Sequence, residues 1–508
     1  MTEKGEVTAR GPRAGSPRGV GVGAAKVVEG GIVVCLFIFV LFAPHSIAVT
    51  QGAWLLGMAL WLVRLALRPR PMLYKTPVDY LLLGFFILTG LSSFLSYEPI
   101  VSIGKLRAAS LFTIVYLFAE NVPSLRVVRA LAITLVCSCL FSVLYTGGER
   151  LVGRGVKVFG VSEESALYKA GVRDGDTLLS VNGKKIWNPQ DLVDAISASG
   201  NQTAAVAAYR HELVPVFQVP RNGLRVGSSS PLDQLGIGSW VRGRDWRATG
   251  LYGQFVTFAE VLQLVIALAL GLFVSLPVKR SWLGILLIVA LAGFSFALLL
   301  TVTRASWLGE IVSTLLILAM TIRRRTLIVI GLLAIPLVFA GLFMLQQKRN
   351  VRFIDQKDDS TTWRTTVWRE GAKLLVSQPR HLLVGIGMDS IKRRWRQWGM
   401  FDGGRIPWGH MHSNFLQIAL ERGVPALILW LGFLFVYART LWRSVRSRTE
   451  RHWIERGILV GAFGGLTGFA TSGLVHYNWG DSEVVMVFYA IVGMTCVVAR
   501  SSEKSARI

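Results

Sequence analysis

The chain has 508 residues, 52% of which are hydrophobic, and its mean hydropathy is +0.49. This composition excludes a soluble globular fold and indicates a polytopic membrane protein. The formal net charge of +25 comes largely from basic connections between apolar runs, so no nucleic acid partner is needed to explain it.

Twelve apolar runs are long enough to cross the roughly 30 Å hydrocarbon layer of a membrane. They lie at 31–49, 51–67, 78–96, 107–121, 128–146, 254–276, 282–301, 305–321, 326–345, 424–441, 457–475 and 484–499. The sequence therefore predicts an all-α polytopic membrane protein with about twelve transmembrane helices. We divide the chain into a tail (1–30), N-terminal membrane helices (31–149), an inserted domain (150–225), further membrane helices (226–345), an outer loop (346–423) and C-terminal membrane helices (424–508).

Lysines and arginines are concentrated in every second connection between these runs. Basic clusters precede the first run and follow the second, fourth, sixth, eighth and tenth, whereas the connections 46–50 and 476–483 contain neither residue. Because basic loops stay in the cytoplasm, both termini are predicted to be cytoplasmic. For the first run, a cleaved signal peptide ending near Ala48 is the alternative. The four cysteines lie within apolar runs and form no disulfide framework or metal set.

The first long outer segment, 147–253, carries the pattern of a small α+β domain. A short helix ends at Gly171, and strand 177–181 leads into an Asn182-Gly183 hairpin turn. An amphipathic helix follows at about 190–198. This pattern resembles a bacterial PDZ domain over roughly residues 153–220.

PDZ domains bind an extended peptide as an additional strand at a sheet edge. The resemblance therefore implies a peptide or protein tail as a partner, and a spacer without a ligand is the alternative. The segments 153–156 and 158–161 are two candidates for the loop that binds the carboxylate of the peptide.

The second long outer segment, 346–423, is basic and rich in tryptophan. Residues 348–405 contain thirteen Lys or Arg against six acids, and five tryptophans recur between Trp363 and Trp408. The excess of positive charge indicates an anionic partner, either lipid headgroups or a pyrophosphate. The tryptophans suit a segment in the headgroup layer, with a surface helix at 363–376, or an ordinary aromatic belt.

The segment 409–426 places two histidines and an asparagine where a helical pattern meets an apolar run. Polar groups in such a position usually face a cavity or a site. The order His412-Ser413, nine residues, then Gly423 resembles the signature of the O-antigen ligase and polymerase family of bacterial membrane glycosyltransferases. Ala426 departs from the Gly, Thr or Tyr that usually ends this signature. The resemblance implies a multi-pass protein of the bacterial inner membrane that takes a glycan from a polyprenyl pyrophosphate carrier.

Three arginines resemble further elements of the same family. Arg304, followed by Leu308, opens the eighth apolar run, and Arg364 precedes a Pro379…Gly385-Ile-Gly387 pattern. Arg247 resembles a weaker element before the sixth run. Guanidinium groups bind phosphate in a bidentate manner and can stabilise the charge that develops on a departing pyrophosphate. We therefore expect these three arginines to bind substrate.

The histidines suit the proton transfer that the reaction needs, because a neutral imidazole near pH 7 can accept the proton of an attacking hydroxyl. We interpret His412 as the general base of an inverting, metal-independent transfer without a cofactor. His410 and Asn414 are assigned to substrate binding, although Ser413 or Asn414 could instead cap the helix. No Asp-x-Asp pair lies on an outer loop to hold a divalent ion.

Two other classes of function remain as alternatives. Glu260 and Glu310 lie within apolar runs and would suit a transporter of an anionic or lipid-linked substrate that couples to protons. However, the sequence shows no internal repeat of the kind that such carriers usually have. A scaffold that only displays the PDZ-like domain leaves the basic loop and His412 unexplained. For a glycosyltransferase, the acceptor could be a lipid, a polysaccharide or a protein.

Overall fold

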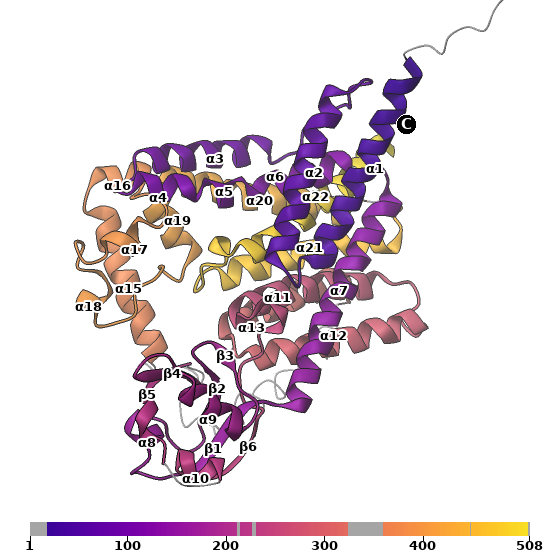
Figure 1. Ribbon diagram of the computed structural model, residues 1–508. Helices are drawn as coiled ribbons and strands as arrows, with labels where there is room; N and C mark the ends of the chain where they lie inside the picture. Colours follow the sequence, from indigo (N-terminus) through magenta and orange to yellow (C-terminus); the bar gives the residue numbers. More distant parts are fainter. Residues whose placement is uncertain (1–17, 211–213, 226–229, 324–358, 448, 506–508) are drawn as a thin grey trace, which may run out of the picture.

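A computed structural model describes residues 18–210, 214–225, 230–323, 359–447 and 449–505. It shows a bundle of long helices with a small β-sheet domain at one end (Figure 1). The start of α1 and the end of α22 lie together at the opposite end of the bundle.

The helices before the sheet are α1 (Arg18–Phe42), α2 (Ile47–Ala66), α3 (Asp79–Phe94), α4 (Pro99–Gly104), α5 (Leu106–Ala109), η1 (Ser110–Phe112), α6 (Thr113–Asn121) and α7 (Leu125–Val152). Those after it are η3 (Gly250–Tyr252), α11 (Phe255–Ser275), α12 (Trp282–Thr301), α13 (Arg304–Thr321), α20 (Val424–Arg446), α21 (Trp453–Ser472), η4 (Asn478–Gly480) and α22 (Ser482–Ser505).

Within the described residues, nine helical stretches are long and apolar enough to cross a membrane. They are Gly23–Phe42, Ile47–Ala66, Pro99–Asn121, Leu125–Val152, Phe255–Ser275, Trp282–Thr301, Arg304–Thr321, Val424–Arg446 and Ser482–Ser501. Of the three other predicted spans, 78–96 is the shorter apolar helix α3 and 457–475 corresponds to α21. The third, 326–345, lies outside the described residues. The all-α polytopic fold is thus confirmed, whereas the number twelve is not.

The helices α11 and α21 pack closely because glycines face each other across their contact. A Cβ atom on Gly271 would lie 2.4 Å from the carbonyl oxygen of Gly457 and from the amide nitrogen of Gly461. Small residues four positions apart allow such close approach of membrane helices. This packing holds the start of α11 beside the end of α21, where the polar cluster described below is found.

The inserted domain is built around an antiparallel sheet with the strand order β5-β4-β2-β1-β6. Its strands are β1 (Arg154–Val161), β2 (Thr177–Val181), β3 (Lys184–Lys185), β4 (Thr203–Tyr209), β5 (Val216–Pro220) and β6 (Ile237–Gly243), and β3 pairs with β2. Its helices are α8 (Ala166–Lys169), α9 (Pro189–Ser197), η2 (Arg221–Gly223) and α10 (Pro231–Leu235). The predicted hairpin turn is present, with positive φ angles at Asn182 and Gly183.

The sheet extends beyond the predicted domain boundary at 225. Strand β6 pairs along β1, with Phe159 opposite Ser239 and Val158 opposite Trp240. Strand β6 therefore belongs to the same sheet although it lies beyond residue 225. The chain leaves and re-enters the membrane bundle at neighbouring points, since the Arg150 guanidinium donates to the backbone carbonyl of Trp246.

Residues 359–422 form a group of helices beside the bundle, between the sheet domain and the end of α3 in the view of Figure 1. They are α15 (Asp359–Val376), α16 (Pro379–Val384), α17 (Ser390–Arg394), α18 (Met400–Gly404) and α19 (Asn414–Arg422). These elements share a small core that includes Val367, Phe401 and Met411. The backbone of α18 is a left-handed turn at Phe401 and Asp402, whose amides donate to the Glu370 carboxylate of α15.

Candidate functional site

The loop that carries the two histidines is fixed between α15 and α19. The Trp368 indole donates to the Met411 carbonyl at 2.7 Å, and the Met411 amide donates to the Gln417 side chain at 2.6 Å. The Met411 side chain is fully buried, and Gly371 leaves room for its sulfur. Trp368 therefore holds the histidine loop in place.

His412 adopts a positive φ of 47°, which is uncommon for a residue with a side chain. Its amide donates to Nδ1 of His410 at 3.2 Å, and the two imidazole rings lie 3.9 Å apart between centroids. The indole ring of Trp363 in α15 meets the His412 ring edge to face, with the two ring centroids 4.3 Å apart. Unusual backbone geometry that is supported in this way is often found at functional sites.

His476, which follows the end of α21, brings a third imidazole to the same place. Its ring centroid lies 5.8 Å from that of His412 and 6.4 Å from that of His410. Its Nδ1 atom is 3.7 Å from Oε1 of Glu260. His476 was not among the site residues predicted from the sequence. Its position on an outer connection without lysine or arginine was the available signal.

Glu260 is buried in the second turn of α11 and is held by three hydrogen-bond donors. Ser306 of α13 donates at 3.1 Å, Ser472 of α21 at 2.9 Å and the Asn478 amide at 3.1 Å. The carboxylate therefore joins three helices and the loop that carries His476. Glu310, by contrast, accepts a bond from Thr314 in its own helix.

The three histidines are neutral at pH 7 in this arrangement. Burial, followed by the neighbouring His410, His476 and Arg364, lowers the pKa of His412 to about 2. Burial and Lys392 lower the pKa of His410 to about 4, and burial with His410 and Arg364 lowers that of His476 to about 3. Neutral imidazoles can accept a proton or donate a hydrogen bond, and a bound anion would favour their charged forms.

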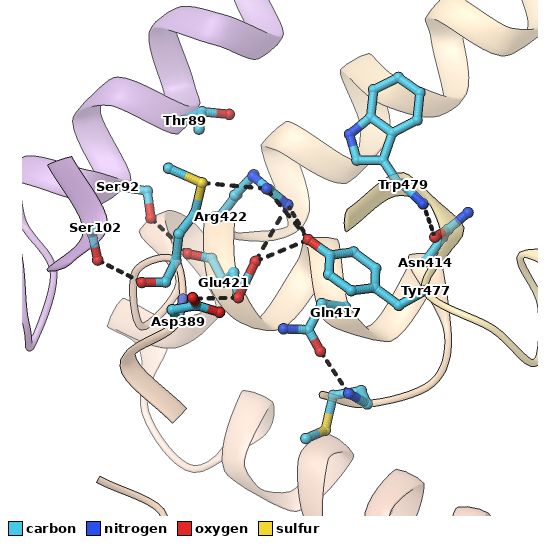
Figure 2. Close-up of polar contacts among 12 residues, drawn as sticks. Thr89, Ser92, Ser102, Asp389, Asn414, Gln417, Glu421, Arg422, Tyr477 and Trp479 are labelled. Atoms are coloured by element: carbon cyan, nitrogen blue, oxygen red, sulfur yellow. Dashed lines mark hydrogen bonds and ion pairs between the residues drawn. The ribbon is translucent and has the colours of Figure 1, made fainter. Parts of the chain in front are cut away.

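The histidines line a cavity of about 670 Å³ between the helices of residues 359–422 and the long helices of the bundle. Glu421 and Arg422, at the end of α19, line it as well, and both are nearly fully buried. Figure 2 shows that the Tyr477 hydroxyl points between them, 3.3 Å from Oε2 of Glu421 and 3.5 Å from the Arg422 guanidinium. Within the described residues, Nε of Arg422 has no hydrogen-bond partner. These three residues were also missed from the sequence, although Glu421 and Arg422 directly precede Gly423 of the motif.

Two lysines lie on the same wall of the cavity. Lys105 and Lys392 each contact the Asp389 carboxylate, at 2.8 and 2.9 Å. Burial opposes ionisation of this carboxyl, but the two lysines together lower its pKa below the ordinary value. Oε1 of Glu421 accepts a bond from the Asp389 amide at 2.9 Å, so this charged group is continuous with Glu421 and Arg422.

The structure separates the predicted site residues into two groups. His410 and His412 line the cavity, and Arg364 is close enough for its charge to affect His412 and His476. Arg304 begins α13, in the same turn as Ser306, which bonds to Glu260.

Arg247 and Asn414 instead make structural contacts. Arg247 donates to the carbonyls of Thr301 and Val302 at the end of α12, and its guanidinium lies over the Phe255 ring. Asn414 is fully buried, donates to the Asn478 side chain at 2.6 Å and accepts from the Trp479 amide at 3.0 Å. Neither residue lines the cavity, and Arg304 and Arg364 are not among its lining residues either. Ser413, in turn, precedes α19 without a side-chain capping bond.

The sheet domain offers a separate binding surface at its edge strand β6. Both segments considered for the carboxylate-binding loop, 153–156 and 158–161, fall largely within β1, which lies between β2 and β6. Strand β6 follows Leu235 and Gly236, and Gly236 has a left-handed backbone conformation. Its exposed residues include Gly238, Ser239 and Val241. The edge of β6 is therefore the better candidate for strand addition.

Comparison with known proteins assigns two parts of the chain. Residues 289–431 match the family model described as O-antigen ligase, and residues 158–210 match a PDZ domain. No significant match to a curated protein was found. The first match runs from within α12 to the first part of α20 and includes Arg304, Arg364, His410 and His412. Glu260 and His476 lie outside it.

Proposed function

We propose that this chain, which carries an O-antigen ligase domain and a PDZ domain between its membrane helices, transfers a glycan from a polyprenyl pyrophosphate carrier to an acceptor on the outer face of the bacterial inner membrane. The observation that carries this proposal is the cavity lined by His410, His412 and His476 beside Arg364. Neutral proton acceptors next to a guanidinium are what an attack by a hydroxyl and departure of a pyrophosphate require.

The arginines would bind the donor. Arg364 lies near the histidines, and Arg304 begins the helix whose first turn contacts Glu260. A guanidinium presents two parallel donors to a phosphate, and it stabilises the negative charge that develops as the carrier leaves. Arg422, with an unpartnered Nε in the described part of the chain, adds a third cation at the wall of the cavity.

His412 would accept the proton of the attacking hydroxyl. The reaction is then an inverting, metal-independent displacement, in which the acceptor oxygen approaches the anomeric carbon opposite the pyrophosphate.

Arg247 and Asn414 would act indirectly, because Arg247 fixes the end of α12 and Asn414 ties α19 to the loop of His476.

The surroundings of the buried acids weigh against the transporter alternative. Glu260 is held by Ser306, Ser472 and Asn478 next to His476, which suits a fixed orienting group better than a carrier of protons across the membrane. If the protein is a proton-coupled transporter, Glu310→Gln should abolish transport as fully as Glu260→Gln does. If it is a glycosyltransferase, Glu310→Gln should have only a small effect on glycan transfer.

The PDZ domain would hold a peptide or protein tail at the β6 edge. This arrangement favours a protein as acceptor or as partner, beside the lipid and polysaccharide acceptors that the ligase domain also suits. Peptides with a free carboxyl terminus should bind the full-length protein, and the same peptides with an amidated terminus should not.

The proposed topology places the PDZ domain and the second outer segment on the same side of the membrane, with both termini in the cytoplasm. A cysteine introduced at exposed Asn201 and another at exposed Gly403 should both react with an impermeant maleimide added from outside. Labelling of only one of them would contradict this topology.

The function itself is tested by comparing a deletion strain with the wild type. The deletion should remove one class of surface glycan or glycoprotein and should accumulate the corresponding polyprenyl-pyrophosphate-linked glycan. Unchanged glycans together with unchanged carrier-linked intermediates would contradict the proposal.

A further inference from the structure

His476 faces an acid on one side and the cavity on the other. Its Nδ1 atom lies 3.7 Å from Oε1 of Glu260, and its side chain is 12% exposed. An imidazole that accepts a proton is commonly oriented by a carboxylate at one ring nitrogen, which leaves the other nitrogen for the proton and stabilises the imidazolium that forms. The pair formed by His476 and Glu260 has this arrangement in outline, at a distance slightly longer than a hydrogen bond.

The Glu260 carboxylate is unusually well fixed for such a role. Its donors come from α13, α21 and η4, and its side chain is 1% exposed. A carboxylate that cannot turn away determines which ring nitrogen of His476 carries the hydrogen. Nδ1 of His476 has no hydrogen-bond partner among the described residues at the present separation of 3.7 Å, and a small approach to Glu260 would make it the donor and leave Nε2 to accept.

His412 has no such support. No acid is recorded beside its ring, its Nδ1 atom is buried without a hydrogen-bond partner among the described residues, as is that of His476, and His410, His476 and Arg364 all disfavour a positive charge on the ring. The His412 and His476 ring centroids are 5.8 Å apart. A direct N–H···N bond would place them roughly 5 Å apart, so a small movement or one bridging water joins them.

We infer that His476 and Glu260 receive the proton that the acceptor hydroxyl loses, with His412 as the link between them. This inference rests on the proposed function. The acceptor oxygen forms a bond to the anomeric carbon, and the bond from that carbon to the pyrophosphate oxygen breaks with its electron pair. His412 takes the hydroxyl proton at one ring nitrogen and gives the hydrogen of its other ring nitrogen to Nε2 of His476. The resulting imidazolium is stabilised by the Glu260 carboxylate.

The test uses a nucleophile that has no proton to lose. The full-length protein in lipid nanodiscs is given polyprenyl-pyrophosphate-linked glycan extracted from the deletion strain, with either membranes of that strain as the source of acceptor or sodium azide. His476→Asn keeps a donor near the Nδ1 position but cannot accept a proton, and Glu260→Gln removes the charge. Glu310→Gln, in the neighbouring helix α13, is the matched control for a buried acid.

We expect His476→Asn and Glu260→Gln to slow transfer to the natural acceptor by on the order of 10²-fold, the lower end of the contribution of a general base. Both variants should still form glycosyl azide at a rate close to that of the wild type, because azide needs no proton acceptor. Glu310→Gln should retain both reactions. An equal loss with azide and with the natural acceptor, or no loss with either, would overturn the inference. A wild-type protein that releases no polyprenyl pyrophosphate in either assay would contradict the proposed function instead.

Discussion

The indole ring of Trp363 meets the imidazole ring of His412 edge to face, with the ring centroids 4.3 Å apart. Trp363 also donates to the Pro407 carbonyl at 3.2 Å, so it contacts the histidine loop at two points. Arg364 is the next residue along α15. The helix turn that supports the proposed base therefore also carries a proposed pyrophosphate ligand, which couples the position of the donor to that of His412.

Replacing Arg364 or Arg304 with lysine should weaken donor binding. An ammonium group keeps the charge but cannot form two parallel hydrogen bonds to a phosphate. Loss of one charge-assisted bond costs about 1.5–3 kcal/mol, which corresponds to on the order of 10- to 100-fold in affinity. Binding of the carrier-linked glycan to each variant in nanodiscs measures this, with Arg369→Lys on the exposed face of α15 as the control. Wild-type affinity in both variants would exclude the arginines as pyrophosphate ligands.

Stability should fall as the pH is lowered below about 6.5. The folded-state pKa values of His410 and His412, about 4 and about 2, lie below the reference value for the unfolded chain. The unfolded state therefore binds more protons from pH 6.5 downwards, which favours unfolding. The melting temperature of His412→Gln should decrease less between pH 7.5 and pH 5 than that of the wild type. Parallel curves for His412→Gln and wild type would show that His412 is not buried as described.

Removing the PDZ domain should leave the membrane part folded. The strands between residues 154 and 243 form one sheet. The chain segments that enter and leave this domain lie close to each other, because Arg150 donates a hydrogen bond to the Trp246 carbonyl. Replacement of 154–243 by a short Gly/Ser linker should preserve expression and transfer to azide, while binding of carboxyl-terminal peptides is lost. Removal of 153–222 alone should be worse tolerated, because it leaves β6 without its partner strand β1. Equal stability of the two deletions would argue against β6 as a part of the domain.

The amino-acid sequence was sufficient to predict a polytopic helical membrane protein and, within the PDZ domain, strand β2 with its hairpin turn and the helices α8 and α9. Long apolar runs and the Asn182-Gly183 turn are local signals, and both correspond to elements of the structure. Strand β6 was not predicted, because its pairing with β1 joins segments far apart in the chain. Helix α21 has the predicted position, but the glycines that allow it to pack against α11 also reduce its hydropathy.

The candidate site was predictable only in part, because it is assembled from four separate regions of the sequence. The family resemblance led to His412 and Arg364. His476 and Glu260 come together with them through the packing of α11 against α21, which no local pattern encodes. Asn414 was assigned to substrate binding because it lies beside the histidines, yet its side chain turns to Asn478 and Trp479. Neighbours in sequence at a helix start can point in different directions.

The most direct test of the central claim is single-turnover transfer by His412→Ala, measured together with its affinity for the carrier-linked glycan. A general base contributes about 10²–10⁴-fold to the rate and little to donor binding. We predict that His412→Ala binds the donor like the wild type and loses transfer by that factor, while His410→Ala is affected less. Transfer by His412→Ala at the wild-type rate would contradict the account and would leave His412 as a residue that only shapes the loop.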